Sequence, residues 1–176
     1  MSLKSDLTSW YNKMTGVAPT RQVNGRFKKI TTQDIDQVEK QLGMVLPHTY
    51  REFLLNSNGE PPYFDTCDVS TEDDEDKILY SFTIRKFIAL GPGGVGELIR
   101  NYLNFKTRLP ERMLPIAFDK FRNLMCLELG TGKVFFWDMQ SILEESRKNR
   151  ERHSLYLVSP NFEKFNEKLY KQNKFL

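Results

Sequence analysis

The length, composition and charge of the chain exclude several classes of protein. Its 176 residues suit one domain that buries about 70% of its unfolded surface, and a charged content of 28% argues against a membrane protein. A net charge of +3 is too small to indicate direct nucleic-acid binding, and two cysteines do not make a disulfide framework. We therefore expect a soluble protein of the reducing cytoplasm whose two thiols are unpaired.

Residues 1–29 are predicted to form an extension of the main domain, which spans residues 30–176. Four apolar residues at helical spacing predict a short helix, followed by a loop: Leu3, Leu7, Trp10 and Met14. The sequence contains no apolar run of signal-peptide or bilayer-spanning length. These features agree with a cytoplasmic protein that makes no membrane contact.

Two helices are predicted at the start of the main domain. Thr31 and Asp34 resemble a capping box, and Gly43 suits the left-handed end of the first helix. Pro47 is suited to the first turn of the second helix, and Asn58-Gly59 to the reversal that ends it. The apolar side chains expected to face the core from both helices are Ile35, Val38, Leu42, Tyr50, Phe53 and Leu54.

A strongly acidic segment follows, from Asp65 to Asp76. Seven of its twelve residues are acidic and none is basic. Such a run is expected to be a solvated loop, and a protein partner with a basic surface would be attracted to it. The candidate partner-binding residues are therefore Asp65, Asp68, Glu72, Asp73, Asp74, Glu75 and Asp76.

The rest of the chain predicts strands and hairpins, with helices between and after them. Strand formers fill residues 78–90, a helix is predicted over 97–105 and a strand over 113–118. Gly130-Thr131-Gly132 separates two apolar runs and predicts a β-hairpin. Helices are predicted over 139–152 and after Ser159-Pro160. This order predicts the α+β class, a mainly antiparallel sheet covered by helices.

The glycine-rich segment Gly91–Gly96 matches the GxGxxG pattern of dinucleotide-binding loops. Asp119 closes the next predicted strand, where a ribose-binding acid could lie. Three observations oppose this interpretation. Pro92 lacks the amide that would face a phosphate, only one βαβ unit could follow, and the nearby hairpin favours antiparallel pairing.

The sequence does not suggest catalytic or metal-binding chemistry. His48 and His153 are too few for most metal sites or triads, and neither Cys67 nor Cys126 lies in a catalytic signature. Adjacent acids in a loop are not held rigidly enough for acid–base catalysis. We therefore expect no enzyme activity, no metal and no cofactor.

Two blocks of sequence resemble the SMI1/KNR4 family, also called the SUKH superfamily. The first is the pair of predicted helices with its LG, LP and NG turns, at Leu42-Gly43, Leu46-Pro47 and Asn58-Gly59. The second is LPIA, a break with Asp and Asn, and two strands that end in an aromatic residue and Asp. It runs from Leu114 to Asp138. The resemblance covers Ile30 to Leu169.

This resemblance implies a function. Bacterial members of the family look like non-enzymatic immunity proteins, which bind a cognate toxin, commonly a nuclease, and block it by occlusion. Fungal relatives look like intracellular regulators, so a regulatory or scaffold adaptor is the alternative. A nucleotide-binding enzyme that uses Gly91–Gly96 is the second alternative. The sequence leaves the oligomeric state and the identity of the toxin open.

Overall fold

Helices and two antiparallel sheets make up the described part of the chain. The computed structural model describes residues 29–60, 64–70, 77–91, 97–139 and 155–170. The elements are α2 (Thr32–Leu42), α3 (His48–Ser57), β1 (Thr66–Ser70), β2 (Ile78–Thr83), β3 (Lys86–Phe87), α4 (Glu97–Phe105), β4 (Met113–Phe118), β5 (Leu124–Glu128), β6 (Val134–Trp137), β7 (Leu155–Ser159) and α6 (Phe162–Lys168). Strands β3-β4-β5-β6-β7 form one sheet in that order, and β1-β2 form the other. The predicted α+β class is confirmed.

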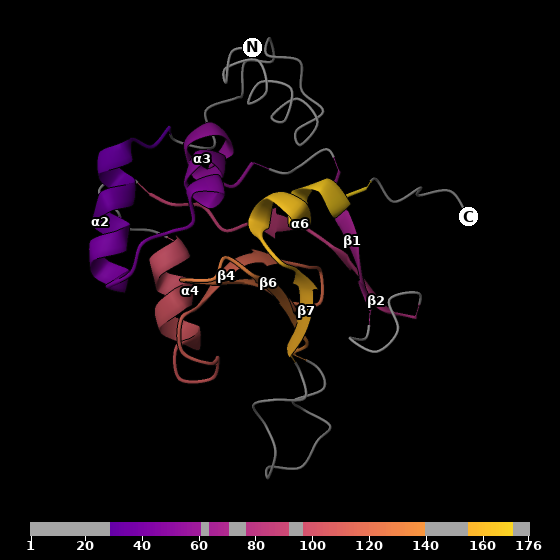
Figure 1. The fold of residues 1–176 in the computed structure, drawn as a ribbon. Coiled ribbons are helices and arrows are strands. Elements are labelled where there is room, and N and C mark those ends of the chain that lie inside the picture. Colours follow the sequence, from indigo (N-terminus) through magenta and orange to yellow (C-terminus); the bar gives the residue numbers. More distant parts are fainter. Residues whose placement is uncertain (1–28, 61–63, 71–76, 92–96, 140–154, 171–176) are drawn as a thin grey trace.

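Helices α3 and α6 lie on the same side of the five-stranded sheet, and the β1–β2 hairpin lies to the right of it in Figure 1. The contact between α3 and α6 is made by aromatic rings. The ring of Phe162 in α6 lies 5.0 Å from Tyr50 and 5.2 Å from Phe53 in α3, measured between centroids. Phe53 also contacts Phe87 of β3 at 4.7 Å. Edge-to-face aromatic pairs of this kind add to the free energy of burial, so they fix α3 and α6 on the sheet.

The five-stranded sheet buries both of its faces. Met125 and Leu127 of β5 belong to the larger apolar core, while Leu124 and Cys126 belong to a smaller cluster with Trp137. Because side chains alternate along a strand, these two clusters occupy opposite faces of the sheet. Trp137 is therefore part of the core.

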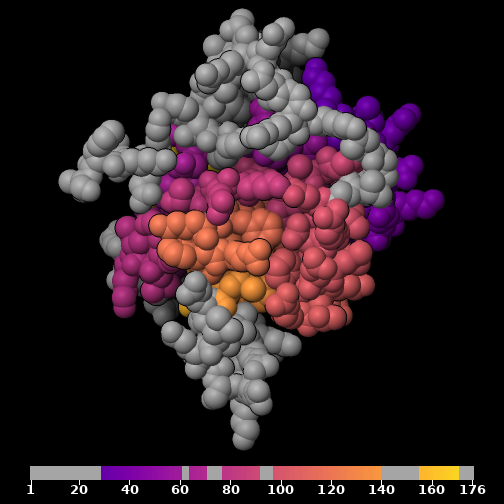
Figure 2. Space-filling view, turned by 180° about the vertical axis from the view of Figure 1, so that it is seen from behind, coloured from indigo at the N-terminus to yellow at the C-terminus, as the bar shows by residue number. Residues whose placement is uncertain are grey.

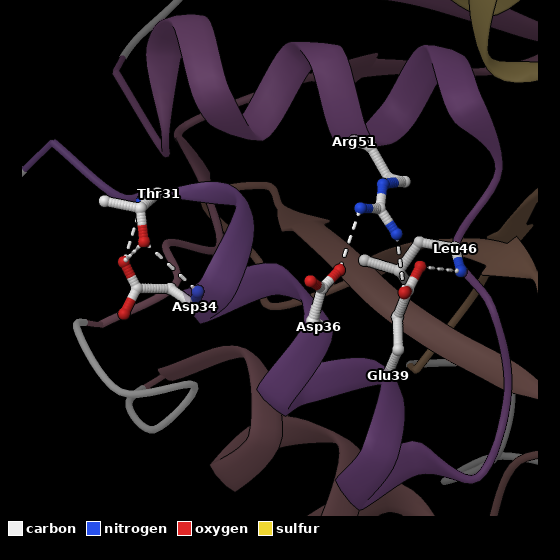
Figure 3. A network of polar contacts seen from close by, with 6 residues as sticks. All are labelled: Thr31, Asp34, Asp36, Glu39, Leu46 and Arg51. Atoms are coloured by element: carbon white, nitrogen blue, oxygen red, sulfur yellow. Dashed lines mark hydrogen bonds and ion pairs between the residues drawn. The ribbon is translucent and has the colours of Figure 1, made fainter.

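The capping box of α2 is present as predicted (Figure 3). The Asp34 amide donates to Thr31 Oγ1 at 3.3 Å, and the Thr31 amide donates to Asp34 Oδ2 at 2.7 Å. Gly43 ends the helix with a φ of 68°, a conformation that glycine adopts without a Cβ penalty. All six side chains predicted to face the core from α2 and α3 are buried.

The Asn58-Gly59 turn joins α3 to the segment after β3. The Asn58 side chain accepts from the Leu90 amide and donates to the Leu90 carbonyl, both at 2.8 Å. Both turn residues have positive φ, 34° and 87°. A Cβ added to Gly59 would lie 2.7 Å from the Cβ of Ala89, so this position requires glycine for space as well as for conformation.

Several expectations differ from the structure. The segment predicted as an acidic loop contains β1, and the segment 78–90 is divided into β2 and β3, which belong to different sheets. Strand β7 was not predicted at all. The predicted N-terminal helix lies outside the described residues, as does nearly all of the helix predicted over 139–152. The predicted strand over 113–118 and the GTG hairpin are confirmed as β4 and as β5–β6.

Candidate partner-binding surface

The β1–β2 hairpin carries the two candidate acids that the structure describes. Asp65 precedes β1, and Asp68 lies within it; both are partly exposed. Glu72 to Asp76 join β1 to β2 and lie outside the described residues. The burial pattern of β1 is typical of a strand, because Cys67 and Val69 are buried while Asp68 between them is not.

Hydrogen bonds hold Asp68 in place on the strand. Its Oδ1 accepts from Ser81 Oγ at 2.6 Å and from the Tyr170 hydroxyl at 2.9 Å. Burial and the bond to Asp68 both raise the pKa of Tyr170. Asp65 accepts from Thr66 Oγ1 at 3.0 Å. The two acids are therefore positioned groups, which lose less conformational freedom on binding than a free side chain would.

Three large apolar side chains are exposed on or next to the same small sheet. Ile78 is 57% exposed, Leu79 is 43% exposed, and Tyr170, which bridges to Thr66, is 38% exposed. Ile78 pairs with Ser70 across the hairpin, next to a register shift. Exposed apolar side chains beside charged ones are typical of protein-binding surfaces. Tyr170 therefore lies beside the acids predicted from sequence, since its hydroxyl bonds to Asp68, while Ile78 and Leu79 are exposed toward the far end of the hairpin.

Asp119 has a structural role in place of the ribose-binding role that sequence suggested. Its Oδ1 accepts from the amides of Phe121 and Asn123 at 2.8 and 2.9 Å. Its Oδ2 accepts from the Tyr80 hydroxyl at 2.5 Å and from the Asn123 side chain at 3.0 Å. Burial and then this bond raise the pKa of Tyr80. All the acceptor capacity of Asp119 is thus used within the β4–β5 turn and its contact with β2.

The topology also opposes a dinucleotide site at the glycine-rich segment. Strands β3 and β4 flank that segment and α4, and they pair antiparallel. A dinucleotide-binding loop requires parallel strands on either side of its helix. Gly91 is described, whereas residues 92–96 are not.

Neither cysteine is poised for chemistry. Both thiols are buried and free, and burial raises the pKa of Cys67 to about 12 and that of Cys126 further. His48 is exposed on the first turn of α3. Within the described residues, no group of three or more His, Cys, Asp or Glu side chains could hold a metal ion.

A basic groove lies at the edge of the five-stranded sheet. Its volume is about 700 Å³, and cationic residues from three segments line it: Arg85, Lys86, Arg108, Lys120 and Arg122. The face in Figure 2 shows α4 and the loop after it (salmon) beside the turn that follows β4 (orange). Sequence reasoning did not find these residues, because they are scattered between positions 85 and 122 with no common spacing.

Comparison with known proteins identifies the family. A model of the SMI1 / KNR4 family (SUKH-1) matches residues 29–168. The chain belongs to the SMI1/KNR4 (SUKH-1) family. It is also similar to the SPbeta prophage-derived uncharacterized protein YokK of Bacillus subtilis (strain 168). The two are 24% identical over 159 residues, which cover 80% of this chain and 76% of that protein.

The structure explains the residues by which the SMI1/KNR4 resemblance was recognised. The NG turn holds α3 against the segment after β3, and the Asp and Asn of the second block form the hydrogen-bonded β4–β5 turn. Asn123 extends that network, because its Oδ1 accepts from the Met139 amide at 3.0 Å. These positions are thus structural in this SMI1/KNR4 chain. Among the described helices, none is long and apolar enough to cross a membrane.

Proposed function

We propose that this protein is a non-enzymatic immunity protein, which binds a cognate toxin and blocks its active site or substrate groove by occlusion. Two findings support the proposal: membership of the SMI1/KNR4 (SUKH-1) family and the β1–β2 hairpin. The hairpin is the single structural observation that carries it. It forms its own small sheet, and it presents acidic and apolar side chains together.

The chemistry of the hairpin indicates a partner with a basic rim around an apolar contact. Asp65, Asp68 and Glu72 to Asp76 supply the negative charge, and Ile78, Leu79 and Tyr170 supply apolar area. A nuclease carries Lys and Arg around its substrate groove, because phosphate neutralisation dominates nucleic-acid binding. An inhibitor that covers the groove can offer carboxylates in place of the phosphates. The toxin of this pair is therefore proposed to be a nuclease.

The contribution of Ile78 can be tested with two variants of matched exposure. Ile78→Ser removes a 57% exposed side chain from the hairpin, and Leu103→Ser removes a 59% exposed one from α4. Truncating a central interface anchor costs about 2 kcal/mol or more, which is at least tenfold in affinity. We expect Ile78→Ser to weaken toxin binding about tenfold and Leu103→Ser to leave it unchanged.

The measurement is calorimetry with the toxin domain encoded by the neighbouring gene, combined with melting curves of both variants. Neither substitution should change the melting temperature appreciably, since both side chains are exposed. Equal affinity losses for the two variants would remove the hairpin from the interface. If no neighbouring gene encodes a toxin domain, the regulatory or scaffold adaptor becomes the better explanation of the same surface.

A further inference from the structure

The basic groove gathers cations that have no carboxylate partner in the described part of the chain. The described part of the chain contains four ion pairs, and only one of them, Lys86 with Glu97 at 2.5 Å, involves a cation of the groove. Asp119 is the groove's acid, and its oxygens accept four hydrogen bonds from the turn and from Tyr80. Arg85, Arg108, Lys120 and Arg122 are therefore left to attract an anion.

Aromatic rings lie among these cations. Phe105 and Phe118 are part of the groove wall and are half-buried, and Phe121 is 50% exposed on the adjoining turn. The Arg108 guanidinium lies 4.8 Å from the centre of the Phe105 ring, and Lys120 Nζ lies 4.7 Å from that of Phe121. Cations interleaved with aromatic rings are typical of surfaces that bind a phosphate backbone and stack bases.

The turn that carries two of the cations is held rigidly. Asp119 binds two amides of the turn, and Arg122 has a φ of 70°, which is unusual for a residue with a long side chain. Strained backbone persists where the surrounding bonds determine it, and such positions cluster at binding sites. The backbone that carries Lys120 and Arg122 is therefore fixed, so only their side chains must be ordered when a ligand binds.

We propose that this groove binds a nucleotide phosphate, either free or within single-stranded RNA. Arginine forks match phosphate oxygens in pairs, and the exposed ring of Phe121 beside the groove offers a stacking surface for a base. A volume of about 700 Å³ falls within the usual range of small-ligand pockets. Binding here is independent of toxin binding by the β1–β2 hairpin. The proposal also reverses the expectation of no direct nucleic-acid binding that the net charge of +3 supported. The acids of residues 65–76 offset the cations of the groove in that net charge.

The test measures binding to two probes that share this chemistry. A fluorescent eight-residue uridine RNA is titrated by anisotropy at 50 and 200 mM salt, and 5′-AMP is titrated by calorimetry. Each phosphate neutralised in a single strand contributes about 0.7 to the slope of log affinity against log salt. Four cations predict a slope of about −2.8, which is a loss of about 50-fold between the two salt concentrations.

A matched pair of double variants assigns the binding to the groove. Arg85→Gln with Arg122→Gln removes two groove cations and should reduce the salt-dependent loss to about sevenfold. Lys40→Gln with Lys133→Gln removes two exposed cations outside the groove and should leave affinity and slope unchanged. Melting curves check that both double variants are folded.

Each outcome decides the proposal. Binding of RNA without 5′-AMP identifies a strand as the source of the phosphate, and binding of 5′-AMP alone identifies a free nucleotide. The proposal is overturned if neither probe binds, or if both double variants lose the same affinity. It is also overturned if an oligoglutamate peptide binds the groove and neither phosphate probe does.

Discussion

Glu39 fixes the junction between α2 and α3, and its substitution offers the sharpest test of how these helices are held (Figure 3). Its Oε1 accepts from the Leu46 amide at 2.7 Å, and its Oε2 accepts from Arg51 Nη1 at 2.5 Å. The hydrogen bond that Arg51 donates to Glu39 is the first cause of the raised pKa of Arg51. The same guanidinium also reaches Asp36 at 3.0 Å. One network thus contains two carboxylates in different environments.

The exposure of the two carboxylates sets the magnitudes. The Glu39 side chain is 12% exposed, whereas that of Asp36 is 64% exposed. Glu39→Gln keeps the shape, but its single oxygen can serve only one of the two donors. Losing a charge-assisted hydrogen bond in this partly buried site should cost about 1.5–3 kcal/mol. Asp36→Asn breaks only an exposed pair and should cost about 0.5 kcal/mol or less.

Thermal unfolding at pH 7 compares the two variants directly. A domain of this size loses about 2–4 °C of melting temperature per kcal/mol, so Glu39→Gln should melt about 3–12 °C lower. Asp36→Asn is the matched control, and its melting temperature should fall by about 2 °C at most. Equal shifts for the two variants would refute the reasoning, because the semi-buried carboxylate would then contribute no more than the exposed one.

Three further predictions concern the core and its buried polar groups. Leu42→Ala and Phe53→Ala should each cost about 2–5 kcal/mol and Thr31→Ala only about 1 kcal/mol; a urea series that ranked the cap above the core would contradict this. The Tyr50 hydroxyl is buried without a partner among the described residues, so Tyr50→Phe should stabilise the protein by about 1 kcal/mol. Burial raises the pKa of Tyr50 above that of tyrosine in the unfolded chain, so Tyr50 leaves the free energy of unfolding unchanged below about pH 10 and lowers it as the pH rises further. Urea titrations at about pH 7 and about pH 11 should therefore show a smaller loss of stability for Tyr50→Phe than for the parent protein. Because the pKa of Cys67 is raised to about 12, a disulfide reagent at pH 8 should react at once only in the unfolded protein, and immediate reaction of the folded thiol would contradict its burial.

Local patterns were sufficient to predict α2, α3 and the β5–β6 hairpin. The capping box at Thr31, the left-handed stop at Gly43 and the GTG turn each depend on residues within a few positions of one another. Propensity and turn chemistry act at that range, so the sequence displays them directly. Membership of the SMI1/KNR4 family was predicted from the same local features, and the match of the family model over residues 29–168 confirms it.

The strands that were not predicted depend on tertiary contacts. Strand β1 lies in an acid-rich segment. Its many acids favour the prediction of a loop more strongly than the alternation of Cys67 and Val69 with Asp68 favours a strand. Strand β7 is five residues long, and it is stabilised by pairing with β6, which is more than fifteen residues earlier in the chain. A partner strand this far away lies outside the short stretch of sequence from which a strand is predicted. The basic groove was not predicted for a related reason, since the fold alone brings Arg85, Arg108 and Arg122 together.

The role of the acidic segment is tested most directly by the association rate with the cognate toxin at two salt concentrations. Replacing Asp73, Asp74, Glu75 and Asp76 with Ser or Asn removes four charges from the proposed partner-binding surface. Electrostatic steering raises association rates by about 10–10³-fold and weakens with salt. The quadruple variant should therefore associate at least about tenfold more slowly at low salt, with a smaller difference at high salt and an unchanged melting temperature. Equal association rates for variant and parent at low salt would contradict the proposal that this acidic hairpin binds the toxin.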